Sequence, residues 1–415
     1  MDAAITIVGA GPAGLALARE LQRRGVRPVL LERGQVGETW ARQYQGLRLH
    51  ALASASGLPG MPLPAVSGPF PSAPEMARYL RAYAQRFGID VREGVTLEAA
   101  EPTPAAAGGG EHSERHDDDG DHDDDGDDGD HGDHGDHGVP PGWRLRTDRG
   151  AWHTRRLVMA TGIWSAPVEP ALPGRERYGG RASHVASYRG PEELAGARVL
   201  VVGLGNSGKD VALAAARVAE QATVAVQRGA LFVDYPNALT QHSGELWRRL
   251  PPRVAAALLR RVRREHAVGD LRWPERPLTE VYPVVGLELV EAVRAGEVRV
   301  RPAMTAFTEA GARFADGDED AFDVIVLCTG YRPALDPLAA HLRWDVSGLP
   351  RTDDAGLRAL DAPGLYLFGY HYPTLETWLQ RLRREAPAAA RAIAADVRRE
   401  ADGAPDQASR SPAEA

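Results

Sequence analysis

The stretch Ile5-Thr6-Ile7-Val8-Gly9-Ala10-Gly11-Pro12-Ala13-Gly14 decides the fold of this chain. Its four apolar residues predict a short strand, and the glycines lead into a helix-forming run at residues 15–24. In such a unit the first glycine permits the tight turn, the second lets a phosphate group approach the backbone, and the third lets helix and strand pack closely. Free N–H groups at the start of the helix favour an anion, and Pro12 suits the first helical turn. The stretch therefore predicts a site for the pyrophosphate of a dinucleotide.

A carboxylate stands where this unit would contact a ribose. Residues 28–32 are typical of a second strand, which ends on Glu32, eighteen residues after Gly14. A carboxylate at this place accepts hydrogen bonds from ribose hydroxyls and repels a 2′-phosphate. The first site is therefore expected to hold FAD or NAD.

The same pattern recurs later in the chain. An apolar strand at residues 198–202 precedes Gly203-Leu204-Gly205-Asn206-Ser207-Gly208, and a helix is expected to run to about Ala219. The following strand, residues 222–227, is succeeded by Arg228 and not by an acid. A guanidinium pairs with a 2′-phosphate, so this second site is expected to prefer NADPH. Together the two sites predict a flavoprotein that takes hydride from NADPH.

The segment between the two units carries a family signature. Tyr178-Gly179-Gly180-Arg181-Ala182-Ser183-His184-Val185-Ala186-Ser187-Tyr188 resembles the F-x-G-x-x-x-H-x-x-x-(Y/F/W) motif of class B flavoprotein monooxygenases. Further segments are similar to motifs of that family: Val36-Gly37-Glu38-Thr39-Trp40, Ala160-Thr161-Gly162, Gly203–Gly208 and Leu327-Cys328-Thr329-Gly330-Tyr331. Residues 44–50 and 58–64 are similar to the plant YUCCA branch of the flavin-containing monooxygenases and to its bacterial relatives.

The resemblance implies an activity. NADPH would reduce FAD, and the reduced flavin would form a C4a-hydroperoxide with O₂. One oxygen atom would pass to a small organic substrate, at a soft N or S centre or on a 2-oxo acid, and the other would leave as water. Two alternatives stay open: a Baeyer–Villiger or N-hydroxylating monooxygenase, and a non-oxygenating flavoprotein that senses NADPH in transport or regulation.

The resemblance and the two glycine motifs together give a set of candidate site residues. His50, which falls where animal relatives carry an active-site Asn, and Asn206 are the candidate catalytic residues, and no metal ligand is expected. Trp40 is expected in the wall of the flavin pocket. His184 is expected to tie the linker between domains, and Lys209 to lie on the exposed face of its helix. The candidate cofactor-binding residues are Gly9, Gly11, Pro12, Ala13, Gly14, Glu32, Arg33, Gly37, Thr39, Trp40, His50, Val95, Ala160, Thr161, Gly162, Gly203, Gly205, Asn206, Ser207, Gly208, Arg228, Thr329, Gly330 and Tyr331.

The expected fold class is α/β, with two Rossmann-type dinucleotide-binding domains and the NADP domain inserted into the FAD domain. The FAD domain is expected to comprise residues 1–165 and 326–395, and the NADP domain residues 166–325. A low-complexity acidic insertion is expected at residues 104–140, joining two adjacent strands, and a polar tail at residues 396–415.

Composition excludes several kinds of protein. The formal net charge is −8, but residues 111–138 alone carry 12 Asp, 2 Glu and 1 Arg, so the remainder of the chain has a net charge of +5. The single cysteine, Cys328, excludes disulfide frameworks, C-x-x-C redox pairs and Cys-based zinc sites. The apolar runs are shorter than a membrane span. We therefore expect a cytoplasmic enzyme that acts on a small molecule and O₂, without nucleic acid or an integral membrane segment; a homodimer is left open.

Overall fold

The computed structural model describes most of the chain. The described residues are 2–64, 66–103, 141–234, 251, 253–254, 257, 283–346, 348–360, 362–371 and 377–401. The acidic insertion expected at residues 104–140 lies outside them, as does the tail beyond residue 401.

The first lobe is built on a seven-stranded sheet of order β3-β2-β1-β6-β5-β4, with β19 also paired to β6. β1, β2, β3, β6 and β19 run parallel, whereas β4 and β5 join as antiparallel strands. The long strand β6 divides one edge between two partners, pairing with β5 near its start and with β19 near its end. The strands are β1 (Asp2–Val8), β2 (Val29–Glu32), β3 (Asp90–Glu93), β4 (Leu97–Thr103), β5 (Gly142–Thr147), β6 (Gly150–Met159) and β19 (Leu365–Leu367).

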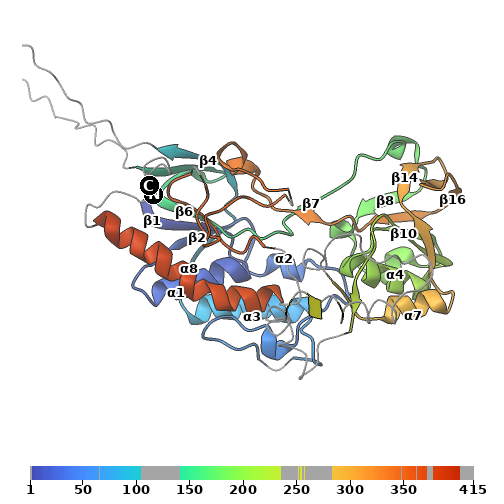
Figure 1. Cartoon of the computed structure of the whole chain (residues 1–415), viewed down its shortest axis with the longest axis horizontal. Coiled ribbons are helices and arrows are strands. Elements are labelled where there is room, and N and C mark those ends of the chain that lie inside the picture. Colours follow the sequence, from blue (N-terminus) through green and yellow to red (C-terminus); the bar gives the residue numbers. More distant parts are fainter. Residues whose placement is uncertain are drawn as a thin grey trace, which may run out of the picture.

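Three helices cover one face of this sheet (Figure 1). They are α1 (Pro12–Gln22), α3 (Ala73–Arg86) and α8 (Trp378–Ala401), and the short helix α2 (Glu38–Ala41) leads toward the second lobe. The apolar stripes of these helices pack on Ile5 and Ile7 of β1 and on Leu30 of β2, all three fully buried. Ser72 and Glu75 form a capping box that fixes the start of α3. A second apolar cluster around Trp143 and Leu145 covers the opposite face.

The second lobe is a five-stranded parallel sheet of order β13-β10-β9-β17-β8. Helices α4 (Asn206–Val218) and α7 (Glu288–Arg294) pack on one face, and a three-stranded antiparallel sheet packs on the other. The strands of this lobe are β8 (Arg181–His184), β9 (Arg198–Val202), β10 (Gln221–Val226), β11 (Phe232–Val233), β12 (Val284–Val285), β13 (Arg299–Pro302), β14 (Met304–Phe307), β15 (Gly311–Phe314), β16 (Glu319–Ala321) and β17 (Val324–Leu327). The α/β class with two such lobes is confirmed.

The chain crosses between the lobes twice, and the two crossings pair with each other. β7 (Ala166–Pro167) and β18 (Tyr331–Arg332) form a two-stranded antiparallel sheet in the middle of the molecule (Figure 1). The boundary expected between residues 325 and 326 is wrong by a few positions, because it cuts β17, which belongs wholly to the second sheet. The tail expected from residue 396 is also placed too early, because α8 continues to Ala401.

The two strands that flank the acidic insertion are neighbours. β4 and β5 pair antiparallel, and the last pair of the ladder is Thr103 with Gly142. The prediction that the insertion joins two adjacent strands is therefore confirmed. Among the described residues no helix is long and apolar enough to cross a membrane, and no group of three or more His, Cys, Asp or Glu could hold a metal ion.

Candidate active site

A cleft of about 1110 Å³ is lined by residues of both lobes. Its lining comes from both glycine turns, the segment 47–51, the two crossings between the lobes and the start of α8. Most of the candidate cofactor-binding residues line it. Four of them do not: Gly14, Gly203, Arg228 and Thr329.

In the first glycine motif, packing requires two of the three glycines. Gly9 has a φ of +103°, and a Cβ there would lie 2.7 Å from the carbonyl oxygen of Ala160. A Cβ on Gly14 would lie 2.0 Å from the carbonyl oxygen of Gly9. Both approaches are closer than a side chain tolerates, so these two positions set the turn and the packing of α1 on β1.

The second motif repeats this geometry. Gly203 has a φ of +104°, and a Cβ there would lie 2.5 Å from the carbonyl oxygen of Cys328. A Cβ on Gly208 would lie 2.1 Å from the carbonyl oxygen of Gly203. Cys328 therefore packs against the second glycine turn in the same way as Ala160 packs against the first.

The middle glycines face open space. A Cβ on Gly11 or on Gly205 would meet no atom within 4 Å, and both residues line the cleft. Each is the N-cap of its helix, α1 or α4, and neither helix start has a side-chain cap or an acidic residue in its first turn among the described residues. Two uncapped helix N-termini with room beside them suit two pyrophosphates. The residues present therefore fit FAD and NADP.

Glu32, the predicted ribose ligand, lies beside the first glycine turn. It lines the cleft at the end of β2, and its carboxylate accepts hydrogen bonds from the backbone N–H of Ala10 (2.8 Å) and of Gly34 (3.1 Å). These bonds fix the carboxylate beside the glycine turn. Arg33 and Val95 also line the cleft there.

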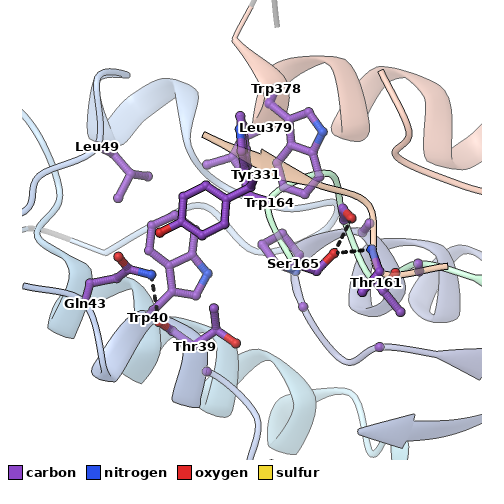
Figure 2. Close-up of a pocket in the computed structure, with 18 of the residues that line it drawn as sticks. Thr39, Trp40, Gln43, Leu49, Thr161, Trp164, Ser165, Tyr331, Trp378 and Leu379 are labelled. Carbon is purple, nitrogen blue, oxygen red and sulfur yellow. Dashed lines mark hydrogen bonds between the residues drawn. The ribbon is translucent and has the colours of Figure 1, made fainter. Parts of the chain in front are cut away.

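An aromatic group forms the wall between the two lobes (Figure 2). Trp40 and Tyr331 both line the cleft, and Trp164 meets Trp378 edge-on with 5.7 Å between ring centroids. The indole N–H of Trp378 donates to the carbonyl oxygen of Gly369 (3.1 Å), which orients that ring. Trp40, which is predicted in the wall of the flavin pocket, lines the cleft, and its contact with the flavin stays a prediction.

Sequence reasoning missed much of this wall. Trp164 and Ser165 lie two and three residues after Gly162 of the A-T-G segment, so their position near a predicted motif was the available signal. The Ser165 hydroxyl donates to the carbonyl oxygen of Gly162 (2.7 Å) and accepts from the N–H of Ala334 (3.0 Å), and thereby joins the two crossings. Leu49 lies in the segment 44–50 that resembles the YUCCA branch, whereas no quoted motif marks Gln43, Trp378 or Leu379.

His50 lines the cleft as a half-buried side chain. Burial lowers the pKa of its imidazole below 6.5, Lys209 lowers it further, and Asp210 and Glu288 oppose this shift. The ring is therefore neutral at neutral pH and can donate one hydrogen bond and accept another. Its catalytic role remains a prediction.

Asn206 also lines the cleft, but its side chain already has partners. Its Nδ2 donates to the carbonyl oxygen of Pro283 (3.1 Å), and its Oδ1 accepts from the N–H of Val285 (2.9 Å). Arg228 lies just beyond the end of β10, exposed. That is the edge of the second sheet at which Gly203 also lies, since the N–H of Gly203 donates to the carbonyl oxygen of Ala225.

Two further expectations have different outcomes. His184 accepts from the N–H of Ala186 and hydrogen-bonds through Nε2 to the carbonyl oxygen of Gly330 (3.1 Å), so its role in tying the linker is confirmed. Lys209 was expected on an exposed face, which is wrong: its side chain is 1% exposed. Burial of the ammonium is offset because Nζ donates to the carbonyl oxygen of Val285 (2.6 Å) and lies 3.4 Å from Oδ1 of Asp210.

The glycine geometry yields a first prediction. Gly14→Ala forces a methyl group against the Gly9 carbonyl and should lower the free energy of unfolding by about 2 kcal/mol. Gly11→Ala adds its methyl group to open space, so it should leave the apoprotein as stable as the parent but reduce the FAD bound per chain. Thermal unfolding of apoprotein and flavin absorbance of purified protein measure the two effects. Full FAD content in Gly11→Ala would contradict the pyrophosphate assignment.

A second prediction concerns pH. As the pH falls through the lowered pKa of His50, the neutral ring becomes a cation, and turnover should decline on the acid side. His50→Asn keeps a neutral hydrogen-bonding group that does not titrate, so this decline should weaken. The measurement is kcat from about pH 5 to 8. His341→Asn, at a histidine packed on Trp143 away from the cleft, is the control. An unchanged acid limb in His50→Asn would remove His50 from the proposed role.

Comparisons with known proteins agree with this geometry. Residues 154–342 match the family model described as flavin-binding monooxygenase-like, and residues 6–104 match that of pyridine nucleotide-disulphide oxidoreductases. The chain is 32% identical over 344 residues to the indole-3-pyruvate monooxygenase YUCCA1 of Oryza sativa subsp. japonica, covering 79% of this chain and 76% of that protein. It is 30% identical over 353 residues to the indole-3-pyruvate monooxygenase YUCCA8 of Oryza sativa subsp. indica, covering 79% and 75%.

Solved structures are similar over nearly the whole chain. A flavin-containing monooxygenase from Stenotrophomonas maltophilia has a TM-score of 0.68 and 26% identity, covering 95% of this chain and 98% of that one. The complex of OTEMO with FAD and NADP has a TM-score of 0.67 at 18% identity, covering 97% and 87%, and shares the fold. Because the sequence has a single cysteine, Cys328, it has no C-x-x-C pair for disulfide chemistry. Cys328 is also buried. The chain belongs to the flavin-binding monooxygenase-like family and is an FAD- and NADP-dependent flavoprotein.

Proposed function

We propose that this protein is an NADPH-dependent monooxygenase that transfers one oxygen atom of O₂ to a soft N or S centre, or to a 2-oxo acid, of a small molecule bearing an aromatic ring. The observation that carries the proposal is that both glycine turns open into one shared cleft, whose lining also includes Trp40, Trp164, Tyr331 and Trp378. When bound, FAD supplies electron acceptance from NADPH and the activation of O₂.

The residues of the chain would bind and orient the two cofactors and the substrate. Gly11 leaves room for a pyrophosphate at the start of α1, and Gly205 does so at the start of α4. Glu32 would accept hydrogen bonds from a ribose of FAD. Neutral His50 would offer a hydrogen bond inside the cleft without adding charge.

The aromatic wall favours a flat substrate. Trp164 and Trp378 line the cleft as an edge-to-face pair, and Leu49 and Leu379 add apolar side chains to its lining (Figure 2). Aromatic pairs add about 0.5–1.5 kcal/mol beyond the burial of apolar area. Apolar walls also exclude water from a reacting centre. An aryl compound should therefore bind better here than an alkyl compound of equal size.

The function is tested with a pair of sulfides, thioanisole and butyl methyl sulfide, under ¹⁸O₂. We expect NADPH-dependent formation of sulfoxide that contains ¹⁸O, with a lower KM for thioanisole. Trp164→Leu should raise the KM for thioanisole about fivefold and change that for the alkyl sulfide little. Trp344→Leu is the matched control, because Trp344 is 42% exposed, close to the 40% of Trp164, and lies outside the cleft.

The outcomes separate two claims. NADPH oxidation without ¹⁸O in either product would overturn the monooxygenase proposal for this substrate class. Oxygenation of both sulfides with equal KM values in the parent and in Trp164→Leu would overturn only the aromatic preference.

A further prediction concerns the nicotinamide cofactor. Arg228 is exposed at the edge of the second sheet, where a 2′-phosphate is expected. Arg228→Ala should raise the KM for NADPH about tenfold and leave the KM for NADH nearly unchanged, since a charge-assisted hydrogen bond contributes about 1.5–3 kcal/mol. Arg217→Ala, exposed on α4 away from the cleft, should change neither. Equal changes for NADPH and NADH in Arg228→Ala would refute the 2′-phosphate contact.

A further inference from the structure

Two side chains in the first turn of α4 bind one short backbone segment, residues 283–285. Asn206 bonds the carbonyl oxygen of Pro283 and the N–H of Val285, and Lys209 donates from Nζ to the carbonyl oxygen of Val285. The three distances are 3.1, 2.9 and 2.6 Å. Both backbone hydrogen-bonding groups of Val285 are therefore held by side chains of one helix.

The carboxamide of Asn206 takes the place of a neighbouring strand. On its other edge β12 pairs with β11, where the N–H of Val284 donates to Leu231 and the N–H of Gly286 donates to Val233, both at 2.8 Å. A primary amide presents one donor and one acceptor in the manner of a peptide group. It can therefore bond the carbonyl of one residue and the N–H two residues on, as a paired strand would.

Lys209 adds a buried charge to this contact. Its ammonium lies 3.4 Å from Oδ1 of Asp210 and 3.9 Å from Oε2 of Glu288. Oδ2 of Asp210 in turn accepts from the hydroxyl of Tyr44 (2.8 Å), which belongs to the first lobe. A buried ammonium is costly unless it is paired and hydrogen-bonded. An apolar side chain could fill the same space but could not donate a hydrogen bond. Compared with such a side chain, Lys209 adds the hydrogen bond to Val285.

The bound segment forms part of the cleft. Pro283 and Val285 line it together with Val233 of β11, beside Gly205 and Ser207 at the start of α4. This is the side of the cleft where the second glycine motif would hold NADP. The position of the segment therefore sets the width of the cleft next to that cofactor.

We propose that Asn206 and Lys209 are positioning residues that hold the segment 283–285 as a wall of the NADP site. Asn206 then acts through the backbone of Pro283 and Val285 and not on the reacting atoms. Lys209 acts through its hydrogen bond to Val285, and Asp210 and Glu288 lie near enough to its ammonium to offset the charge. The inference rests on NADP binding at the second glycine motif and is independent of which substrate is oxygenated.

The test compares Lys209→Met, Lys209→Arg and Asn206→Ala in the full-length, FAD-loaded protein. The probe is NADP⁺, with its Kd measured by calorimetry. We expect Lys209→Met and Asn206→Ala each to raise the Kd about tenfold, while FAD content and reduction of the flavin by dithionite stay at the parent level. Lys209→Arg keeps a donor and a charge, so it should restore most of the affinity. Arg217→Met removes a charge from the exposed face of the same helix and should leave the Kd unchanged.

The double variant gives the sharpest outcome. Because both residues act on one segment, Lys209→Met combined with Asn206→Ala should raise the Kd by much less than the product of the two single effects. Parent-like NADP⁺ affinity in folded Lys209→Met, or fully multiplicative effects in the double variant, would overturn the proposal. If Lys209→Met does not fold, parent-like affinity in Asn206→Ala overturns it instead. A parent protein that binds FAD but no NADP⁺ would refute the cofactor assignment and not the hydrogen-bonded wall.

Discussion

The contact of a glycine turn with the end of a neighbouring strand determines the rest of this structure. In the first lobe Gly9 lies against Ala160, whose N–H donates to Val8 (2.9 Å). In the second lobe Gly203 lies against Cys328, whose N–H donates to Val202 (2.8 Å). Only a residue without a Cβ permits either approach. Because the chain leaves each sheet directly after Ala160 or Cys328, the two crossings begin beside the two helix N-termini that suit phosphates.

The short crossings explain why the two lobes share one cleft. β7 and β18 pair with each other, Ser165 bonds both crossings, and His184 bonds the carbonyl oxygen of Gly330. Each contact joins segments that are far apart in sequence, so together they restrict how the lobes can rotate. The carboxyl ends of the central parallel strands then face a common space, which is where open α/β sheets bind ligands.

Local pattern was enough to predict the parts whose cause is local. The strand–glycine–helix units, the α/β class and the pairing of the strands around the acidic insertion follow from apolar runs and glycine spacing over a few dozen residues. The second domain boundary was misplaced because an apolar strand such as β17 does not show which sheet it joins. The aromatic wall was missed for a similar reason, since Trp164 and Trp378 are 214 positions apart in the sequence and meet only in the folded chain.

The error at Lys209 shows the limit of reading charge from sequence. A lysine in a polar helical turn is expected in water, because burial of an ammonium is costly. Among the described residues, Val285 supplies a carbonyl and Glu288 supplies a carboxylate, and Tyr44 of the first lobe binds the neighbouring Asp210. Helical spacing reveals none of these partners. Because the buried ammonium would lose a hydrogen bond if Val285 moved away, this contact favours one position of the segment 283–285.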